Sequence, residues 1–481
     1  MDIKPSDIKA LEERVAKRQY KKYLLEINLK KVRRFSDQKV SFDFPVTAII
    51  GTNGGGKSTI LGACALAYED VKPGDFFPKS NVSDNSMANW RIDYDLIDRS
   101  INHTTVSTNA RFVSAKWRRE KLAKRPIVVV PIQRTVPAGE QTKYKKFIGI
   151  YSKADAHIAD LNSETKTHAG RILAKDLSKF KVARINKDDK DYIFIGYQSD
   201  DDYSQFHFGA GEASVIDMVD RIERSDDFAL VLIEELENGL HPVAIEKMVQ
   251  YLIGVAKRKK IQVVFTTHSE HALKNLPDNA IWACIEGQAY HGRLNISSLR
   301  AMTGDVDAEK VIFVEDAFAV DFVEEILRQG SPDTFAAVEV HKAGGYPYVI
   351  EVLKHHNSNP TVQTKGFAVI DGDQESGEPG VVALPGGIPE YEVFDFILEH
   401  IDAIAAVVQQ RCQCPQVPQD KIASVLKSVK IDTTDPHLLF QKIGNELGFL
   451  SELVVRRAFI SIYVERNPDR VKPIIDMLTA A

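Results

Sequence analysis

Short apolar runs bounded by polar, Pro or Gly positions predict buried strands in the first part of the chain. The clearest is 45–50, Pro-Val-Thr-Ala-Ile-Ile, which leads into a glycine-rich turn and then into the helical stretch 60–68. Runs of this length, rich in Val and Ile, are typical of strands buried on both faces. Further strands are expected at 23–29, 39–44, 91–97, 127–132, 192–197, 229–233 and 262–266.

A second series of alternating strands and helices begins after about residue 306. It consists of expected strands at 310–314, 335–340 and 366–370 and expected helices near 317–329 and 345–356. Because strands that alternate with helices pair in parallel, we predict an α/β protein with parallel sheets in both halves. The region 401–481 is expected to be helical.

Composition and charge narrow the class of protein. Hydrophobic residues make up 44% and charged residues 27% of the 481 residues, which excludes a collagen-like or wholly disordered chain. The 62 Lys and Arg residues against 67 Asp and Glu residues give a net charge of −5. Any nucleic-acid contact must therefore come from local basic patches. Residues 1–22 are rich in Lys, Arg and Glu and are expected to form an exposed helix or a partly ordered arm.

The sequence also predicts a cytoplasmic protein without membrane contact. It has no run of ~18 apolar residues and begins without the basic-then-apolar layout of a secretory signal. The four scattered cysteines fit a reducing compartment, and the C-x-C at 412–414 lacks the second pair that a zinc site requires.

The turn after strand 45–50 predicts phosphate binding. Gly51, Gly56, Lys57 and Ser58 have the spacing of a P-loop, with a strand before it and a helix after it. The glycines allow backbone N–H groups to face phosphate oxygens, Lys57 can reach the β- and γ-phosphates, and the Ser58 hydroxyl can bind Mg²⁺. We expect ATP to be held by Asn53, Gly54, Gly56, Lys57, Ser58 and Thr59.

Three further motifs follow in order along the chain. Strand 229–233 ends in Glu234 and Glu235 and is expected to lie beside the P-loop strand, where carboxylates can hold Mg²⁺ and polarise the attacking water. The loop 208–212, Phe-Gly-Ala-Gly-Glu, opens a helix whose N-terminus can meet phosphate. Strand 261–266 leads to His268, whose imidazole can hydrogen-bond a γ-phosphate.

This order of motifs resembles the ABC ATPases, in particular their Rad50/SMC and OLD branches. The resemblance implies that two heads sandwich two ATP molecules, so that Gly209, Gly211 and Glu212 of one copy face the P-loop of the other. It further implies a dimer contact at 238–242, and the pair Arg34-Phe35 is similar to the Arg-Phe element of Rad50-like heads. Because 60–207 lacks a heptad pattern, no long coiled coil is expected.

The same resemblance assigns roles near the nucleotide. Glu235 would be the catalytic base, His268 would contact the γ-phosphate, and Gln133 would be the metal-sensing glutamine, so that Mg²⁺ would be held by Ser58, Gln133 and Glu234. Gly209 stands where the family usually places Ser, and Glu234 stands where transporters have Asp. Slow hydrolysis, with ATP acting mainly as a dimerisation ligand, is therefore a second expectation beside ordinary turnover.

Acidic residues end two strands of the second half. Glu315 and Asp316 follow 310–314, and Asp371 and Asp373 follow 366–370. Neighbouring parallel strand ends can bring such carboxylates together, and clustered carboxylates can bind Mg²⁺ for phosphodiester chemistry. The arrangement resembles a TOPRIM domain, which implies metal ligands Glu315, Asp371 and Asp373. Asp316 stands where active TOPRIM nucleases have Gly, so solvated acids in a domain without catalysis are an equal alternative.

Residues 384–390, Leu-Pro-Gly-Gly-Ile-Pro-Glu, together with these acids resemble the ATPase subunits of bacterial anti-phage systems of the Septu type, including retron-associated ones. That resemblance implies a separate HNH nuclease partner and a homodimer or higher even oligomer. The alternatives are a self-contained OLD-type endonuclease and a Rad50-like DNA clamp, the latter disfavoured by the absence of heptads.

Basic residues concentrate between 110 and 190, in three clusters at 111–125, 143–146 and 175–184. They predict a DNA- or RNA-binding surface or, alternatively, an ordinary solvated face. The expected organisation is an N-terminal arm at 1–22, an ABC-type head with a mixed sheet at 23–305 carrying the basic insertion at about 100–190, a TOPRIM-like parallel α/β domain at 306–400 and a helical region at 401–481.

Overall fold

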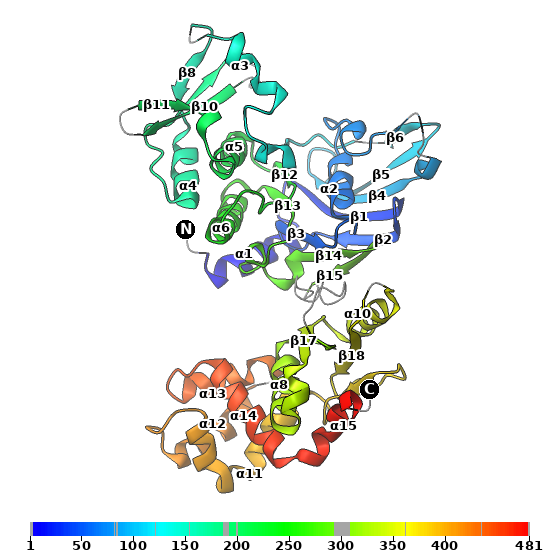
Figure 1. The fold of residues 1–481 in the computed structure, drawn as a ribbon, viewed down its shortest axis with the longest axis vertical. Coiled ribbons are helices and arrows are strands. Elements are labelled where there is room, and N and C mark those ends of the chain that lie inside the picture. The colour runs from blue at the N-terminus through cyan, green and yellow to red at the C-terminus, as the bar shows by residue number, and fades with distance from the viewer. Residues whose placement is uncertain are drawn as a thin grey trace. The chain divides into compact units, whose positions relative to one another are not determined.

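The computed structural model describes residues 3–80, 82, 85–120, 122–152, 154–185, 192–198, 201–292, 308–360, 362–433 and 435–479. They form two compact units, one that ends at Gly292 and one made of the described residues that follow (Figure 1). Each unit has its own sheets and its own hydrophobic core, so each is described by itself.

A six-stranded mixed sheet forms the centre of the first unit, in the order β15-β14-β3-β13-β12-β7. All neighbouring pairs are parallel except β14 with β15. The strands are β3 (Val46–Gly51), β7 (Ile127–Val130), β12 (Leu230–Ile233), β13 (Gln262–Thr266), β14 (Ile281–Ile285) and β15 (Gln288–His291). Every residue of β3, β12 and β13 is buried, as the continuous apolar runs predicted. Every residue of β14, a strand that was not predicted, is buried as well.

The strand order corrects one expectation. The acidic strand β12 does not lie beside the P-loop strand β3, because β13 lies between them. Val263 of β13 pairs with Val46 on one side and with Val231 on the other. A strand that is apolar on both faces can occupy any central position, and its pattern does not specify its neighbours. His268, which follows β13, is thereby brought between the P-loop and the two glutamates.

Two antiparallel sheets, which the alternation of strands and helices did not predict, complete the first unit. One has the order β2-β1-β4-β5-β6 and the other β11-β10-β9-β8. Their strands are β1 (Lys22–Val32), β2 (Phe35–Ser41), β4 (Arg91–Asp98), β5 (Thr105–Val113), β6 (Lys116–Glu120), β8 (His157–Asp160), β9 (Lys181–Arg184), β10 (Tyr192–Gln198) and β11 (Asp201–Ser204). Most of these neighbours are joined by short connections, which favours antiparallel pairing.

The helices of the first unit are α1 (Pro5–Ala16), α2 (Lys57–Leu66), α3 (Lys146–Gly149), α4 (Ser163–Leu173), α5 (Ala210–Arg224) and α6 (Pro242–Lys259). Helix α4 packs against α5 and α6 (Figure 1). Residues 1–22 were expected to form an exposed helix or a partly ordered arm. Residues 5–16 do form the helix α1, but Leu11 and Val15 are buried in the core of the unit. Nine residues of α2 are buried, including Lys57 and Thr59, so the helix after the P-loop is enclosed by the unit.

The basic segment is partly internal. Arg125 is 1% exposed, and its guanidinium donates to Tyr68 Oη, Gln262 Oε1 and the carbonyl of Phe228. Arg119 donates to the carbonyl oxygen of Tyr68 at 2.7 Å. Arg125 is therefore internal and not available to a nucleic acid, whereas Arg119 is partly buried and joins β6 to the end of α2. Lys121 lies outside the described residues.

The second unit contains a parallel sheet in the order β17-β16-β18-β19. Its strands are β16 (Lys310–Val314), β17 (Val338–Lys342), β18 (Lys365–Ile370) and β19 (Val381–Ala383). Its helices are α8 (Ala317–Gly330), α9 (Pro332–Ala336), α10 (Tyr346–Ser358), α11 (Pro389–Arg411), α12 (Gln419–Asp432), α13 (Leu439–Glu446), α14 (Glu452–Arg466) and α15 (Pro468–Thr479). The strand expected at 335–340 begins only at Val338, because Pro332 starts a helical turn that includes Phe335.

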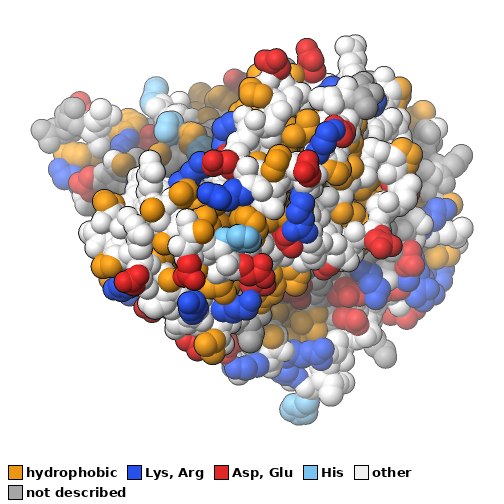
Figure 2. Space-filling model, turned by 90° about the horizontal axis from the view of Figure 1, so that it is seen from below, with side chains coloured by type: hydrophobic (Ala, Val, Ile, Leu, Met, Phe, Trp, Pro, Cys, Tyr) orange, Lys and Arg blue, Asp and Glu red, His pale blue; other side chains and the backbone are white. Residues whose placement is uncertain are grey.

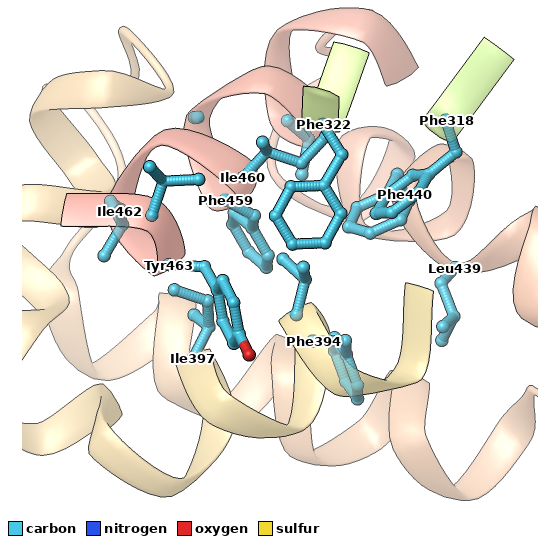
Figure 3. Packing of buried hydrophobic residues seen from close by; sticks show 14 of the residues in the cluster. Phe318, Phe322, Phe394, Ile397, Leu439, Phe440, Phe459, Ile460, Ile462 and Tyr463 are labelled. Atoms are coloured by element: carbon cyan, nitrogen blue, oxygen red, sulfur yellow. The ribbon is translucent and has the colours of Figure 1, made fainter. Parts of the chain in front are cut away.

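The C-terminal helices share one core with the sheet of this unit. Phe318 of α8 stacks on Phe440 of α13 with ring centroids 5.6 Å apart, and Phe322 meets Tyr463 of α14 edge to face at 5.6 Å (Figure 3). Phe459 packs against the edge of Phe440 in the same layer. Buried aromatic pairs of this kind add about 0.5–1.5 kcal/mol each beyond the area that they bury.

On the face drawn in Figure 2, Lys and Arg side chains are interspersed with Asp and Glu side chains and with scattered hydrophobic ones. Hydrophobic side chains dispersed in this way are ordinary for a protein surface. Among the helices that the structure describes, none combines the length and the apolar character needed to cross a bilayer.

Candidate nucleotide-binding site

The P-loop closes tightly against its surroundings. It follows β3, and Gly56 at its end has a φ of 117°, in the region that favours glycine. A Cβ atom on Gly51 would lie 2.1 Å from the carbonyl oxygen of Cys284, and one on Gly56 would lie 2.3 Å from the ring of Phe35. The glycines of the P-loop are therefore required by packing as well as by backbone conformation.

Lys57 is folded back onto the loop. Its Nζ donates to the carbonyl oxygens of Gly51 and Thr52 at 3.0 and 3.1 Å. Only 8% of the residue is exposed, and burial lowers the pKa of its ammonium group. Phosphate oxygens at the mouth of the loop would supply negative charge to this buried ammonium group, in addition to the two carbonyl oxygens that accept from it.

A cleft of 310 Å³ opens beside the loop. Its lining consists of Arg33, Arg34, Phe35, Asn53, Gly54, Gly56, Lys57, Ser58, Thr59, Glu235 and Thr266. The six residues expected to hold ATP are all among them. Arg33 donates to Thr59 Oγ1 at 3.0 Å, and Thr59 is buried, whereas Ser58 is exposed and lines the cleft. A hydroxyl and a carboxylate in one cleft fit Mg²⁺, which prefers oxygen ligands.

The two glutamates after β12 point to different places. The Glu234 carboxylate accepts a hydrogen bond of 3.3 Å from the backbone N–H of Ile132. Glu235 reaches the cleft, and Asn238 Nδ2 donates to Glu235 Oε2 at 2.5 Å. The Glu235 backbone has a φ of 45°, which is unusual for a residue with a side chain. Its N–H donates to Thr266 Oγ1 at 2.8 Å, which ties this conformation to β13.

Arg134 is a residue that sequence reasoning missed. It is 7% exposed and donates to the carbonyl oxygens of Glu234 and Glu235, each at 2.6 Å, and to that of Pro131 at 3.1 Å. Burial lowers the pKa of its guanidinium to about 10, so it stays charged at neutral pH. The neighbouring Gln133 is exposed and, among the described residues, is not part of the lining of the cleft.

His268 lies beyond the end of β13. Its backbone N–H donates to Glu237 Oε1 at 2.6 Å. Burial and the charge of Lys57 lower the pKa of its imidazole, so the ring is neutral at pH 7. A neutral ring with one N–H is able to donate a hydrogen bond to a phosphate oxygen.

The glycine loop belongs to another part of the first unit. Gly209 caps α5, and a Cβ atom on Gly211 would lie 2.1 Å from the carbonyl oxygen of Gly239. Glu212 Oε1 accepts a hydrogen bond of 2.6 Å from Lys175. Of the described residues, those of loop 208–212 do not line the cleft beside the P-loop. The loop thus lies against residues 238–242 instead of facing the P-loop of its own chain.

In the second unit, the acids at the ends of β16 and β18 come together. The Glu315 carboxylate accepts the backbone N–H of Asp371 at 2.9 Å. The pKa of Asp371 is raised to about 8 by burial and then by the negative charges of Glu315, Asp316, Glu390 and Asp373. Burial also raises the pKa of Glu315. This concentration of carboxylates is able to bind a divalent cation.

The comparisons with known proteins agree with this geometry over parts of the chain. Residues 140–274 match a family described as "AAA domain, putative AbiEii toxin, Type IV TA system". A DNA double-strand break repair Rad50 ATPase from Archaeoglobus fulgidus is 40% identical over 63 residues, which are 13% of this chain and 7% of that protein. The chain therefore spans only a small part of the length of this curated relative.

The solved structures that match share less sequence with this chain, and their TM-scores are low. The SMC head domain from Thermotoga maritima has 12% identity and a TM-score of 0.35, covering 56% of this chain and 99% of that one. The recombination mediator protein RecF with ATP has 12% identity and a TM-score of 0.37, covering 56% and 99%. The family match, the local identity with a Rad50 ATPase and the geometry of the P-loop together support an ATPase with local similarity to Rad50.

Proposed function

We propose that the protein binds and hydrolyses ATP between the heads of a dimer, with the P-loop of one copy facing loop 208–212 of the other. The observation that carries the proposal is the composition of the cleft: Lys57, Ser58 and Glu235 line it, whereas the glycine loop of the same chain does not. Loop 208–212 opens α5 and leaves Gly209 exposed, so a second copy can reach its backbone N–H groups.

Some residues of the cleft bind the nucleotide, and others take part in its hydrolysis. The P-loop backbone and Lys57 hold the β- and γ-phosphates, and the Ser58 hydroxyl would hold Mg²⁺, which neutralises charge on the phosphates when bound. Glu235 accepts a proton from the attacking water, and Asn238 keeps its carboxylate oriented. His268 donates to the γ-phosphate from the end of β13.

Glu234 has a positioning role in the site that we propose. Its carboxylate bonds the turn that contains Gln133, so it connects the acidic strand with the glutamine expected to sense the metal. Because Gln133 is exposed and outside the cleft lining, its contribution requires closure of the dimer or movement of the turn at 131–135. Gly209 offers only backbone donors, which is consistent with slow turnover and a long-lived ATP dimer.

For the biological role, we propose a subunit of a bacterial anti-phage complex in which ATP-dependent dimerisation controls or positions an HNH-type partner nuclease. The proposal rests on the resemblance of 308–395 and of the head to Septu-type ATPases. The described basic residues that remain exposed, such as Lys116 and Arg118 of β6, would contribute to a DNA or RNA contact.

A second candidate function is a self-contained OLD-type endonuclease. It is favoured by one observation, the contact of Glu315 with the backbone of Asp371, which brings two of the three expected metal ligands to adjoining strand ends. Asp373 is exposed two residues further on. The extra carboxylate of Asp316 at the same place distinguishes this chain from the nucleases that it resembles.

One set of experiments separates the candidates. Light scattering of Glu235→Gln with and without ATP should reveal an ATP-dependent doubling of mass, because the variant keeps the cleft but lacks the base. A variant that stays monomeric while binding ATP would contradict the dimer. Purified wild-type protein incubated with plasmid and Mg²⁺ or Mn²⁺ should leave the DNA intact, whereas cleavage that is lost in Asp371→Ala would establish the endonuclease.

A further inference from the structure

Three side chains of different elements of the second unit converge beside the strand-end acids. Asp316 caps α8, Glu390 lies in the first turn of α11, and His437 belongs to the 3₁₀ turn η8 (Pro436–Leu438). One potential ligand atom of each lies within 4.8 Å of the other two. The three positions are distant in sequence, so the tertiary fold is what brings them together.

Existing hydrogen bonds orient the three groups and leave ligand atoms available. Asp316 Oδ1 accepts the backbone N–H of Ala319 at 2.9 Å, which leaves Oδ2 without a partner among the described residues. His437 Nδ1 lies 2.8 Å from Glu390 Oε1. The backbone N–H of His437 donates to Asp435 Oδ1 at 3.0 Å, which fixes the turn that carries the ring. The ring therefore meets Glu390 through one hydrogen bond, and the turn that carries it is fixed through its backbone.

The charge around this cluster is strongly negative. The carboxylates of Glu315, Asp316, Asp371, Asp373 and Glu390 belong to one group of neighbouring negative charges, and Glu390 is only 4% exposed. Within the described part of the unit, the one ion pair made by these five carboxylates is that of Glu390 with the imidazole of His437. A buried carboxylate is unfavourable unless a partner compensates its charge. Here one partly exposed imidazole is the partner available to several carboxylates.

We infer that Asp316, Glu390 and His437 form a binding site for a divalent transition-metal ion of the Zn²⁺ or Mn²⁺ type. An imidazole nitrogen with two carboxylates is a donor set that Zn²⁺ and Mn²⁺ accept, whereas Mg²⁺ prefers oxygen ligands and retains water. Bonds of about 2.0–2.2 Å place tetrahedral ligands roughly 3.4 Å apart. The three ligand atoms, which lie within 4.8 Å of one another, therefore move closer when the site closes around an ion.

The site differs from the set expected from the TOPRIM resemblance, which consists of Glu315, Asp371 and Asp373. The His437 side chain is 59% exposed, so an ion bound here keeps at least one position open to water. The ion would replace the proton shared by His437 and Glu390 and would neutralise two carboxylates at once. The site lies in the second unit, and its occupation does not depend on the ATP chemistry proposed for the first.

Calorimetric titration of the full-length protein with Zn²⁺, alongside visible absorption with Co²⁺ as a spectroscopic probe, tests the inference. We expect one ion per chain and d–d bands of a site with a nitrogen ligand. His437→Ala should weaken Zn²⁺ binding about tenfold or more, the loss of one ligand. Asp316→Asn, which retains the cap of α8 but removes the charge, should also weaken it.

Two matched variants complete the test. His400→Ala removes an exposed imidazole of α11 that contacts Phe396 through the carbonyl oxygen and the ring of that residue, and Asp373→Asn removes an acid of the other set. Both should bind Zn²⁺ as the wild type does. The inference is overturned if the wild type binds no Zn²⁺, if His437→Ala binds with unchanged affinity while its thermal unfolding is also unchanged, or if Asp373→Asn loses affinity as much as His437→Ala.

Discussion

Replacing Arg134 by Met tests how the catalytic glutamate is held. The guanidinium of Arg134 bonds the carbonyl oxygens of Glu234, Glu235 and Pro131 at 2.6, 2.6 and 3.1 Å. Hydrogen bonds to a charged group contribute about 1.5–3 kcal/mol each. The cost of burying the guanidinium, visible in its lowered pKa, offsets part of this, so a net loss of about 3 kcal/mol is expected for the variant.

The loss should appear mainly at Glu235. Its φ of 45° is unfavourable for a residue with a side chain. Two hydrogen bonds hold this conformation: Arg134 donates to the Glu235 carbonyl oxygen, and the Glu235 N–H donates to Thr266 Oγ1. If half of the loss is expressed as displacement of the carboxylate, kcat falls about tenfold, since ~1.4 kcal/mol corresponds to one factor of ten. ATP affinity should change little, because Lys57 and Ser58 lie on α2 after another strand.

The assay combines steady-state ATP hydrolysis, equilibrium binding of a fluorescent ATP analogue and denaturant unfolding. Arg91→Ala is the matched control, because Arg91 makes an exposed ion pair with Asp93 that contributes under about 1 kcal/mol. Arg134→Met with wild-type kcat, or a loss of nucleotide binding as large as the loss of hydrolysis, would refute the argument that Arg134 acts through Glu235.

Three further predictions concern other parts of the molecule. Lys57→Ala should abolish binding of the ATP analogue, and unaltered affinity would contradict the P-loop assignment. Gly211→Ala should lower the unfolding temperature and ATP hydrolysis, because its Cβ would meet the carbonyl of Gly239 at 2.1 Å, whereas Gly209→Ala, with open space around its Cβ, should unfold like the wild type. The raised pKa of Asp371, about 8, means that the folded protein keeps a proton that the unfolded chain has lost, so stability should fall from pH 5 to pH 8. Denaturant unfolding of Asp371→Asn should show a flatter pH dependence, and equal slopes in the two proteins would argue against the burial of that carboxyl.

Local features of the first unit were predictable because each depends on residues that are adjacent in the sequence. The P-loop needs its glycines where Cys284 and Phe35 approach the backbone, and the spacing to Lys57 is fixed within one turn. The apolar run 262–266 was identified as a buried strand for the same reason. Its place between β3 and β12 was not predictable, because the pattern of a strand that is apolar on both faces does not specify which strands pair with it.

Contacts between distant elements account for what the sequence left open. Arg134 follows Gln133 in an unremarkable turn, and nothing in its neighbours indicates that it reaches the carbonyls of Glu234 and Glu235. Arg125 was read as part of a basic surface, although its partners on β13 and near residue 68 make it internal. The approach of His437 to Glu390 depends in the same way on the packing of α11 against the turn at 436–438.

Disulfide crosslinking between two copies of the chain tests the proposed dimer most directly. Chains with Asn53→Cys and chains with Gly209→Cys, each also carrying Glu235→Gln, are mixed and oxidised with and without ATP. The four native cysteines are buried, so the introduced pair is the reactive one. We predict a mixed crosslink that forms only with ATP and disappears in Lys57→Ala. A crosslink of equal yield without ATP, or none while ATP is bound, would contradict the dimer in which loop 208–212 of one copy faces the P-loop of the other.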